Sequence, residues 1–282
     1  MKTSLVPIVT RFAPAPTGHL HLGHVLNAVY VWDLARAGGR GGQILLRIED
    51  HDRIRSRPEF ESALLEDLDW LGFAADGPPV RQSERGDIYE RVLDDLRRRG
   101  IVYACQCSRS ELTSGRYPGT CASLGLPESP GLGLRVRLEP PAIERFTDLR
   151  LGPQEQKPSE QCGDLLVRDR DGNWTYQFAV VADDWLQGVT HVVRGEDLLD
   201  STGRQIQLAR LMGRAIPPAF LHHALLMKSP SQKLSKSDGD SGVRDLRAKG
   251  WSAEAVIDRA TSLAGLSRDR IAVRTWSVPE VE

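Results

Sequence analysis

Cysteine is scarce in this chain of 282 residues: only four are present, and three of them fall within one short stretch. Such a small, clustered set does not suit a secreted disulfide framework and favours a metal site in a reducing compartment. No apolar run approaches the length of a membrane span. The N-terminus shows neither the apolar core nor the cleavage site of a signal peptide. We therefore expect a cytoplasmic protein that does not act at a membrane.

The chain also lacks net charge: 37 basic and 38 acidic residues give a formal charge of -1. It therefore has no overall field that attracts RNA, and a nucleic-acid partner would have to be held by a local basic surface. Hydrophobic residues make up 40% of the chain and charged residues 27%, which is typical of a globular protein rather than a disordered or fibrous one. The length allows one large domain or two modest ones.

Strands and helices are predicted to alternate over the first hundred residues. Residues 7–13 have the apolar, β-branched character of a buried strand, and residues 22–37 have helical spacing after a Pro/Gly-rich turn. Residues 43–49 indicate a second buried strand, and residues 58–71 and 85–99 indicate two further helices. This pattern predicts an α/β protein with a Rossmann-like, doubly wound parallel sheet that binds its ligand at the carboxyl ends of the strands.

Residues 100–130 interrupt this alternation. Cys, Tyr, Pro and Gly replace the helical spacing there, which predicts a small inserted lobe held by a metal. Further along the chain we expect strands at residues 134–138 and 165–168, a loop at 152–163, a helix at 201–211 and a Ser/Lys-rich loop at 228–241.

A Pro/Gly-rich motif, PAPTGHLHLGH at residues 14–24, separates the first expected strand from its helix. Backbone N–H groups and the helix dipole favour phosphate at such a position, and glycines such as Gly23 allow a ligand to approach closely. His21 and His24 are three residues apart, so both imidazoles can face the same phosphate oxygens. Without the Pro/Gly frame, two histidines at a helix start would more often cap the helix or bind a metal.

A second motif, KLSKS at residues 233–237, lies in the Ser/Lys-rich loop. The ammonium groups of Lys233 and Lys236 can neutralise phosphate charge as the bond to pyrophosphate breaks, which stabilises mainly the transition state. Alone, a loop of this composition is usually a solvated surface. The presence of both motifs at this separation indicates a site for a nucleoside triphosphate.

The two motifs resemble the signature sequences of class I aminoacyl-tRNA synthetases. The segments RFAPAPTG, LRIEDHDRIRSRPE and DDWLQGVTHVVRGEDLLDSTGRQ resemble the glutamyl branch of that family, and the similarity runs from about residue 9 to residue 266. The 45 residues after residue 237 are too few for the anticodon-binding region of a glutamyl-tRNA synthetase. The chain therefore most resembles the glutamyl-queuosine tRNA(Asp) synthetases, a family of truncated paralogues.

This resemblance implies a ligase that activates glutamate with ATP and Mg²⁺, without tRNA, and transfers it to queuosine in the anticodon loop of tRNA(Asp). It implies catalytic roles for His21, His24 and Lys236 and ATP binding by His21, Gly23, His24, Lys233 and Lys236. We expect a monomer. The rival interpretations are a glutamyl-tRNA synthetase fragment that charges a tRNA 3′ end and a catalytically silent paralogue that binds RNA or glutamate.

Four regions follow from the pattern and the resemblance together. Residues 1–99 and 131–237 are expected to form the two halves of a Rossmann-like catalytic domain, with the KLSKS loop in the second half. Residues 100–130 are expected to form the zinc-binding lobe. Residues 238–282 are expected to form a short helical C-terminal region without an anticodon-binding domain.

A glutamate pocket needs cations for two carboxylates and an anion for the ammonium group. Arg11 ends the first expected strand and Arg194 lies in a matching VVRG turn, where each guanidinium can grip a carboxylate. Glu49 ends the second strand and can pair with the ammonium group. The alternative is a structural ion pair between Arg11 and Glu49. The resemblance adds the hydroxyl of Tyr176 and the backbone of Arg11, Phe12, Ala13, Pro14 and Ala15.

Three cysteines and a tyrosine make up the expected metal site. In an extended strand Cys105 and Cys107 point the same way, so both sulfurs can reach one ion. The resemblance implies one structural zinc ion held by Cys105, Cys107, Tyr117 and Cys121. The alternative is that Tyr117 only packs, while water or Cys162 completes the tetrahedron. Cys162 lies in the expected loop and is otherwise predicted to be a free surface thiol.

Three features have no function assigned from the sequence. The basic run at residues 97–99 ends a helix, where such charges usually complement the dipole and face water. His222 and His223 lie shortly before the second motif and either border the nucleotide or are ordinary strand residues. His51 follows the second strand, and no role can be argued for it.

Overall fold

Parallel strands form the centre of the molecule, for which the computed structural model describes residues 7–36, 41–52, 54–108, 111, 115–229, 232–233 and 242–266. One group pairs in the order β1 (Val9–Phe12), β2 (Gln43–Ile48), β3 (Val80–Arg81), and a second in the order β6 (Glu144–Asp148), β10 (Ala219–His223), β9 (His191–Gly195). The groups meet at β1 and β9, where the Thr190 N–H donates to the Val9 carbonyl at 2.8 Å. The predicted α/β architecture with a parallel sheet is confirmed.

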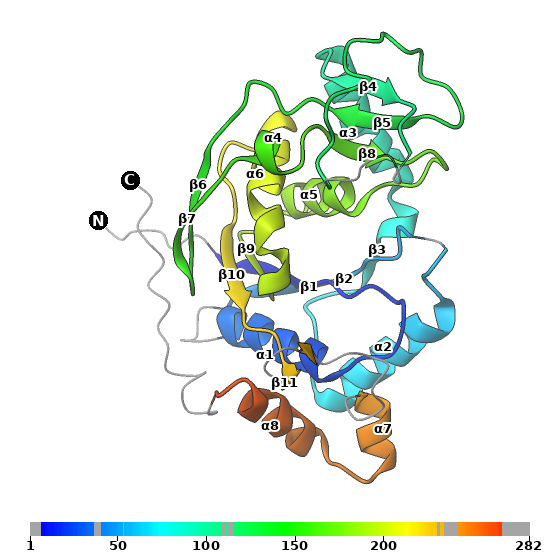
Figure 1. The fold of residues 1–282 in the computed structure, drawn as a ribbon. Helices are drawn as coiled ribbons and strands as arrows, with labels where there is room; N and C mark the ends of the chain where they lie inside the picture. Colours follow the sequence, from blue (N-terminus) through cyan, green and yellow to red (C-terminus); the bar gives the residue numbers. More distant parts are fainter. Residues whose placement is uncertain are drawn as a thin grey trace.

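Helices cover both faces of these strands (Figure 1). One face carries α1 (Leu22–Arg36), and the other carries α5 (Tyr176–Leu186) and α6 (Thr202–Leu211). The connections after β2 and β3 contain α2 (Pro58–Leu71), α3 (Gly86–Arg98) and a 3-10 turn at Gln82–Glu84. α2 has the predicted bounds because Pro58 suits the first turn and Gly72, with a φ of 80°, suits the left-handed cap. Among the described residues, no helix combines the length and the apolarity needed to cross a membrane.

Two apolar cores lie beneath these helices. In the first, α1 packs on β1 and β2 through side chains such as Leu26, Val31 and Ile44, all fully buried. In the second, α3 and α5 pack on a smaller sheet through side chains such as Leu93 and Phe178. Burial of apolar side chains on both faces of the strands holds their carboxyl ends in a fixed place, which is where polar ligands of such sheets bind.

The smaller sheet is antiparallel and consists of β4 (Val102–Cys105), β5 (Gly133–Val136) and β8 (Leu165–Arg168). It lies at the upper end of the molecule in Figure 1. The loop expected over residues 152–163 is wrong: β7 (Gly152–Gln156) pairs antiparallel with β6, and α4 (Pro158–Gln161) forms one helical turn. β7 lies at the edge of its sheet, and its one buried residue, Gln156, is polar, so the strand lacks the apolar signal that marks a buried strand.

The C-terminal part of the described chain returns to α1. After the hairpin of β11 (Met227–Ser229) and β12 (Gln232–Lys233), residues 242–266 contain α7 (Val243–Ala248) and α8 (Ala253–Leu263). Val256 and Ala260 of α8 are buried in the same core as α1. Ser252 caps α8 by accepting the Ala255 N–H at 3.2 Å. Most of the Ser/Lys-rich loop expected at 228–241 lies outside the described residues.

Candidate functional site

A cleft of about 500 Å³ opens where β1, β2 and β9 end, beside the start of α1. Arg11 of β1 and Arg194 of β9 line its walls, together with Glu49 directly after β2, His21 directly before α1 and Tyr176 at the start of α5. β1 has β2 on one side and β9 on the other, so the strand order reverses at this point. Doubly wound sheets bind their ligands in the crevice at such a reversal.

The first turn of α1 fixes both imidazoles of the first motif. The His21 backbone N–H donates to His24 Nδ1 at 3.2 Å, and the Gly23 N–H donates to His21 Nδ1 at 3.1 Å. Each Nδ1 is thus an acceptor, so the neutral rings carry their protons on Nε2. A Cβ on residue 23 would lie 2.8 Å from His21 Cε1, which explains why the position is glycine. Both histidines line the cleft as hydrogen-bond donors at a helix N-terminus.

Arg11 is neutralised by a buried network that spans two strands and a helix. Its Nε donates to Asp184 Oδ1 at 3.0 Å, and its Nη1 donates to the Val193 carbonyl at 3.2 Å. Arg47, which is fully buried, donates to the same Asp184 oxygen at 2.7 Å and lies 3.4 Å from Glu49. Burial opposes the ionisation of Asp184, but the charges of Arg11 and Arg47 hold its pKa below the usual value. The alternative of an Arg11–Glu49 ion pair is therefore wrong. Arg11 pairs with Asp184 instead, and Glu49 pairs with Arg47.

Arg194 has a different set of partners. Its Nη1 donates to Gln205 Oε1 at 2.6 Å, its Nη2 donates to Thr202 Oγ1 at 2.9 Å, and its Nε donates to His222 Nε2 at 3.0 Å. Only 4% of Arg194 is exposed, and burial lowers its pKa. No carboxylate of the described residues forms an ion pair with it. The cleft therefore contains a buried cation that protein groups hold in place without neutralising its charge.

Glu49 and Tyr176 complete the polar wall of the cleft. Burial raises the pKa of the Glu49 carboxyl, while the positive charges of Arg47 and Arg11 oppose that change. Burial also raises the pKa of the Tyr176 phenol, and the charge of Glu49 adds to the effect. A phenol that stays protonated serves as a donor to a ligand carboxylate.

The segment of residues 11–15 divides into two kinds of side chain. Arg11, Ala13 and Ala15 line the cleft. Phe12 is instead buried in the core beside Trp32, with the ring centroids 5.7 Å apart, and Pro14 is buried with its carbonyl accepting the Glu49 N–H at 3.0 Å. The side chains of Phe12 and Pro14 are therefore buried outside the cleft lining, and the prediction for this segment, which concerned its backbone, stays a prediction.

The second motif lies almost wholly outside the described residues: Lys236 is not described, and for Lys233 only the backbone of β12 is. Gly242, the first described residue after the motif, bridges antiparallel to His21, and the Val243 N–H donates to the Leu20 carbonyl at 2.9 Å. The residues that follow the second motif therefore lie against the first motif.

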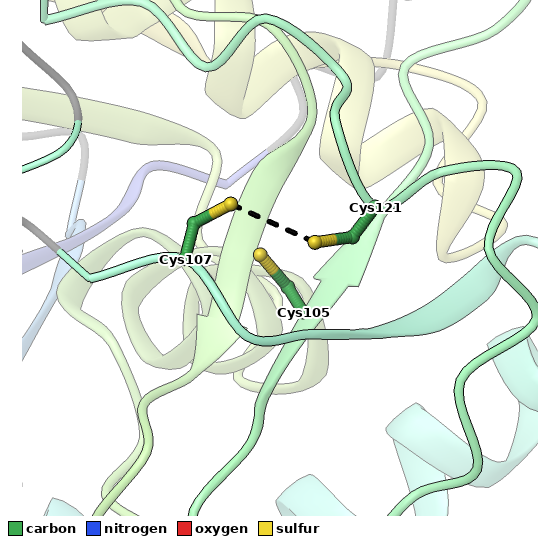
Figure 2. Close-up of side chains that lie close together, drawn as sticks. All are labelled: Cys105, Cys107 and Cys121. Carbon is green, nitrogen blue, oxygen red and sulfur yellow. Dashed lines mark hydrogen bonds between the residues drawn. The ribbon is translucent and has the colours of Figure 1, made fainter.

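Three cysteines of the smaller lobe converge as predicted. Figure 2 shows the side chains of Cys105, Cys107 and Cys121 directed toward one another, and their sulfur atoms all lie within 4.8 Å. Cys107 Sγ and Cys121 Sγ are 3.6 Å apart. In a tetrahedral zinc site with Zn–S bonds of about 2.3 Å, sulfurs lie about 3.8 Å apart. The donor type and the spacing therefore fit a zinc ion.

Tyr117 lies in the same cluster. Its hydroxyl is 3.6 Å from Cys105 Sγ and accepts the Cys121 N–H at 2.8 Å. The Arg135 guanidinium lies over the Tyr117 ring at 3.6 Å and donates to Cys105 Sγ at 3.2 Å.

The prediction of a surface thiol at Cys162 is wrong, because the residue is buried and its thiol donates to the Pro158 carbonyl at 3.1 Å. Cys162 is also absent from the sulfur cluster of the described residues.

A second cavity, of about 690 Å³, adjoins the cleft and extends toward the cysteines. His51, Asp52, Arg55 and Tyr176 line both spaces. His51, which had no predicted role, thus stands between them, with its Nδ1 2.7 Å from Gln82 Oε1. Asp184 and Arg47 were not predicted from the sequence, and His222 was named there without an assigned function, because no local motif marks residues that meet the cleft arginines only in the folded chain.

Comparison with known proteins identifies the family. Residues 7–271 match the family model described as tRNA synthetases class I (E and Q), catalytic domain. The chain belongs to the class I tRNA synthetases, a family of ligases. The resemblance read from the two motifs is therefore confirmed at the level of the family.

Two curated relatives and one solved structure illustrate the similarity. A Glutamyl-Q tRNA(Asp) synthetase of Rhodobacter capsulatus is 39% identical over 272 residues, covering 87% of this chain and 96% of the relative. A Glutamate--tRNA ligase of Oleidesulfovibrio alaskensis is 41% identical over 264 residues, covering 89% of this chain and 56% of that ligase. The crystal structure of a glutamate tRNA ligase from Elizabethkingia meningosepticum in complex with its amino acid has a TM-score of 0.73 and 32% identity. That match covers 83% of this synthetase but only 53% of the crystallised chain.

Proposed function

We propose that this synthetase activates L-glutamate with ATP in the cleft and transfers the glutamyl group to queuosine in the anticodon loop of tRNA(Asp). The observation that carries the proposal is the buried guanidinium of Arg194, whose three hydrogen-bond acceptors are all neutral. A ligand carboxylate would compensate that charge and accept two parallel hydrogen bonds from it. Similarity to the relative named Glutamyl-Q tRNA(Asp) synthetase supports the choice of product.

The glutamate pocket is built from the strand ends. Arg194 and the Tyr176 hydroxyl bind one carboxylate, Arg11 and the backbone of residues 11–15 line the pocket, and Glu49 pairs with the ammonium group. Burial raises the pKa of Glu49, so a cation placed beside it favours the ionised form. The pocket thus offers the uncompensated cation of Arg194 to one carboxylate of glutamate and the anion of Glu49 to its ammonium group.

Activation forms one bond and breaks another. An oxygen of the α-carboxylate attacks the α-phosphorus of ATP, and the bond from that phosphorus to the bridging oxygen breaks, so pyrophosphate leaves with the electron pair. The Nε2–H groups of His21 and His24 donate to phosphate oxygens beside Gly23, and Lys233 and Lys236 neutralise the charge of the leaving group. Mg²⁺ bound to ATP supplies further compensation of phosphate charge.

Activation is proposed to proceed without tRNA. Protein groups alone hold both cleft arginines: Asp184 and the Val193 carbonyl fix Arg11, while Gln205, Thr202 and His222 fix Arg194. A pocket organised by its own chain does not need RNA to place its cations, which lowers the cost of binding glutamate.

Transfer uses the nucleoside hydroxyl as the nucleophile. A hydroxyl of the queuosine cyclopentenediol attacks the activated carbonyl, and the bond from the carbonyl carbon to the phosphate oxygen breaks. AMP leaves with the electron pair and takes up the hydroxyl proton, which leaves an ester on the nucleoside. The second cavity supports this step because it opens onto the cleft at His51 and Tyr176 and offers about 690 Å³ for a splayed nucleoside.

The cysteine lobe is proposed to hold one structural zinc ion through Cys105, Cys107, Cys121 and Tyr117. With these four donors filling a tetrahedron, the ion would link β4 to the segment after it and take no part in catalysis. We propose the same division of the chain as above: a catalytic domain in two halves (1–99 and 131–237), the zinc lobe (100–130) and a helical C-terminal region (238–282). The synthetase would act as a monomer in the cytoplasm.

The test measures the product. Radiolabelled glutamate and ATP are incubated with tRNA(Asp) that contains queuosine, with tRNA(Asp) that contains guanosine instead, and with tRNA(Glu). Label is expected on the first RNA alone, as an ester that mild base removes. The similarity to the Glutamate--tRNA ligase supports a second candidate, the charging of a tRNA 3′ end. Label on the terminal adenosine of tRNA(Glu) would establish that second candidate and reject the first.

A further inference from the structure

A chain of buried polar groups crosses three neighbouring strands and ends at Arg194. Asp148 lies on β6, His222 on β10 and Arg194 on β9, and these strands are adjacent in the order β6–β10–β9. His222 and Arg194 are direct partners in the parallel register of β10 and β9. Asp148 Oδ2 lies 2.7 Å from His222 Nδ1, and His222 Nε2 lies 3.0 Å from Arg194 Nε. The sheet itself therefore sets the spacing of this chain.

The hydrogen-bond pattern requires one tautomer of His222. Asp148 accepts the backbone N–H groups of Arg150, Leu151 and His222, so it acts as an ionised acceptor and takes the Nδ1 proton of the ring as well. His222 Nε2 is then a lone-pair acceptor, which the Arg194 Nε–H needs. A protonated or Nε2–H ring would point a hydrogen at the guanidinium.

The surroundings keep His222 in that state. The ring is fully buried and stacks on Phe220 at an interplanar angle of 13°, and Phe220 also lies beneath the Arg194 guanidinium. Thr202 Oγ1 is 3.1 Å from His222 Nε2 and accepts from Arg194 Nη2 at 2.9 Å. The third acceptor, Gln205, is oriented by its own amide donating to Gln177 Oε1 at 2.8 Å. The three acceptors His222, Gln205 and Thr202 thus orient the guanidinium without adding a negative charge.

We propose that His222, oriented by Asp148, is a positioning residue that aims Arg194 into the cleft while leaving its charge available for the substrate carboxylate. A carboxylate in place of His222 would hold Arg194 equally well but would neutralise it, as Asp184 does for Arg11. The neutral imidazole orients Arg194 without neutralising its charge. This inference rests on the proposed function, since it assigns the carboxylate that Arg194 binds to L-glutamate.

The test compares direct binding of L-glutamate and of ATP by calorimetry in four variants. Asp148→Asn keeps the size of the side chain but presents an amide N–H to Nδ1, which drives the His222 proton to Nε2. His222→Leu removes the acceptor. His222→Gln restores an acceptor oxygen near the position of Nε2. His191→Gln is the matched control, because His191 is a buried histidine at the other end of β9.

Asp148→Asn and His222→Leu are expected to raise the Kd for glutamate at least tenfold and to leave the Kd for ATP within threefold of the wild type. His222→Gln and His191→Gln are expected to stay within threefold for both ligands. Equal losses for glutamate and ATP, or wild-type glutamate binding by both Asp148→Asn and His222→Leu, would overturn the inference. If one variant does not fold, the other decides.

Failure of the proposed function gives a different result. A wild-type protein that does not bind glutamate would reject the function itself. A wild-type protein that binds glutamate, and an Arg194→Ala variant that does not, would retain the function even if the His222 variants behave like the wild type.

Discussion

At the scale of single residues, the two cleft arginines show how partners decide what a charge can do. Arg11 and Arg194 end adjacent strands and line one cleft, but Arg11 pairs with a carboxylate and Arg194 with neutral acceptors. A guanidinium that is paired with a carboxylate still shapes the cleft and supplies hydrogen-bond donors. A guanidinium whose acceptors are all neutral also attracts an anion. Arg194 is therefore expected to contribute more to the binding of an acidic substrate than Arg11.

Replacement of Arg194 by alanine should abolish most glutamate-dependent exchange of pyrophosphate into ATP. The substrate carboxylate would then be buried without its cation, at a cost of about 2 to 5 kcal/mol, or roughly thirtyfold to several thousandfold in kcat/KM. Arg145→Ala is a suitable control, because Arg145 is exposed and pairs with Glu155 on the neighbouring strand at 3.0 Å. Equal kcat/KM for glutamate in both variants would contradict this role for Arg194.

The stability that His222 contributes should depend on pH. Burial lowers the pKa of His222, the Asp148 hydrogen bond opposes that change, and the charge of Arg194 adds to it. In the unfolded chain this histidine therefore takes up a proton near pH 6.5, whereas in the folded chain it does so only at lower pH. The stability that His222 contributes is present above pH 6.5 and is lost as the pH falls below that value. The free energy of unfolding should fall more between pH 7 and pH 5 in the wild type than in His222→Gln. Urea denaturation at both pH values measures the difference, and parallel losses in the two proteins would count against it.

Sequence patterns predicted polar and charged residues of the cleft, but they did not predict the partner residues that hold those side chains in place. Arg11, Glu49, His21 and His24 stand beside local signals, a strand end or a Pro/Gly-rich motif. Asp184 is 173 positions from Arg11 and meets it only after the sheet has formed. Local periodicity carries no information on such a pair, which is why this part of the site had to come from the structure.

At the scale of elements, a strong periodic spacing of apolar residues predicted the bounds of helices and strands, whereas a weak spacing did not. The helix at Pro58–Leu71 and the strand at Leu165–Arg168 have the predicted bounds, since each has an apolar face and a clear start or end. Strand β7 has no apolar residue except Pro153 and was predicted to be a loop. Its backbone pairing with β6, rather than side-chain burial, makes it a strand.

The cysteine lobe should contain one zinc ion per chain. Elemental analysis of protein purified without chelator is expected to find it, and strong chelation should lower the melting temperature, because the ion closes the segment between β4 and Cys121. Tyr117→Phe keeps the ring under Arg135 and removes only the hydroxyl, so weaker zinc binding in that variant would identify Tyr117 as a ligand. Cys162→Ser is the matched control, because Cys162 lies outside the sulfur cluster of the described residues. Absence of stoichiometric zinc would remove the metal proposal, and unchanged affinity in Tyr117→Phe would remove the tyrosine alone.

At the scale of the whole molecule, two cavities share one wall. The cleft lies at the reversal of strand order, and the second cavity extends from it toward the smaller sheet, with His51 and Tyr176 lining both. An acceptor that enters through the second cavity reaches the cleft directly. For the proposed function, this arrangement favours a substrate that inserts one nucleoside over one that must be read at a distant point.

A minimal anticodon stem-loop of tRNA(Asp) that contains queuosine should therefore be a substrate in its own right. Recognition of single-stranded RNA commonly uses a splayed base held in a pocket, and a loop nucleoside is already free of a duplex partner. The stem-loop is expected to accept glutamate with a kcat/KM within about tenfold of the intact tRNA, because the phosphates of a short stem supply much of the electrostatic affinity. Labelled glutamate and gel separation measure the transfer, with the guanosine-containing stem-loop as the control. Intact queuosine tRNA that accepts glutamate while its stem-loop does not would show that contacts outside the anticodon arm are required.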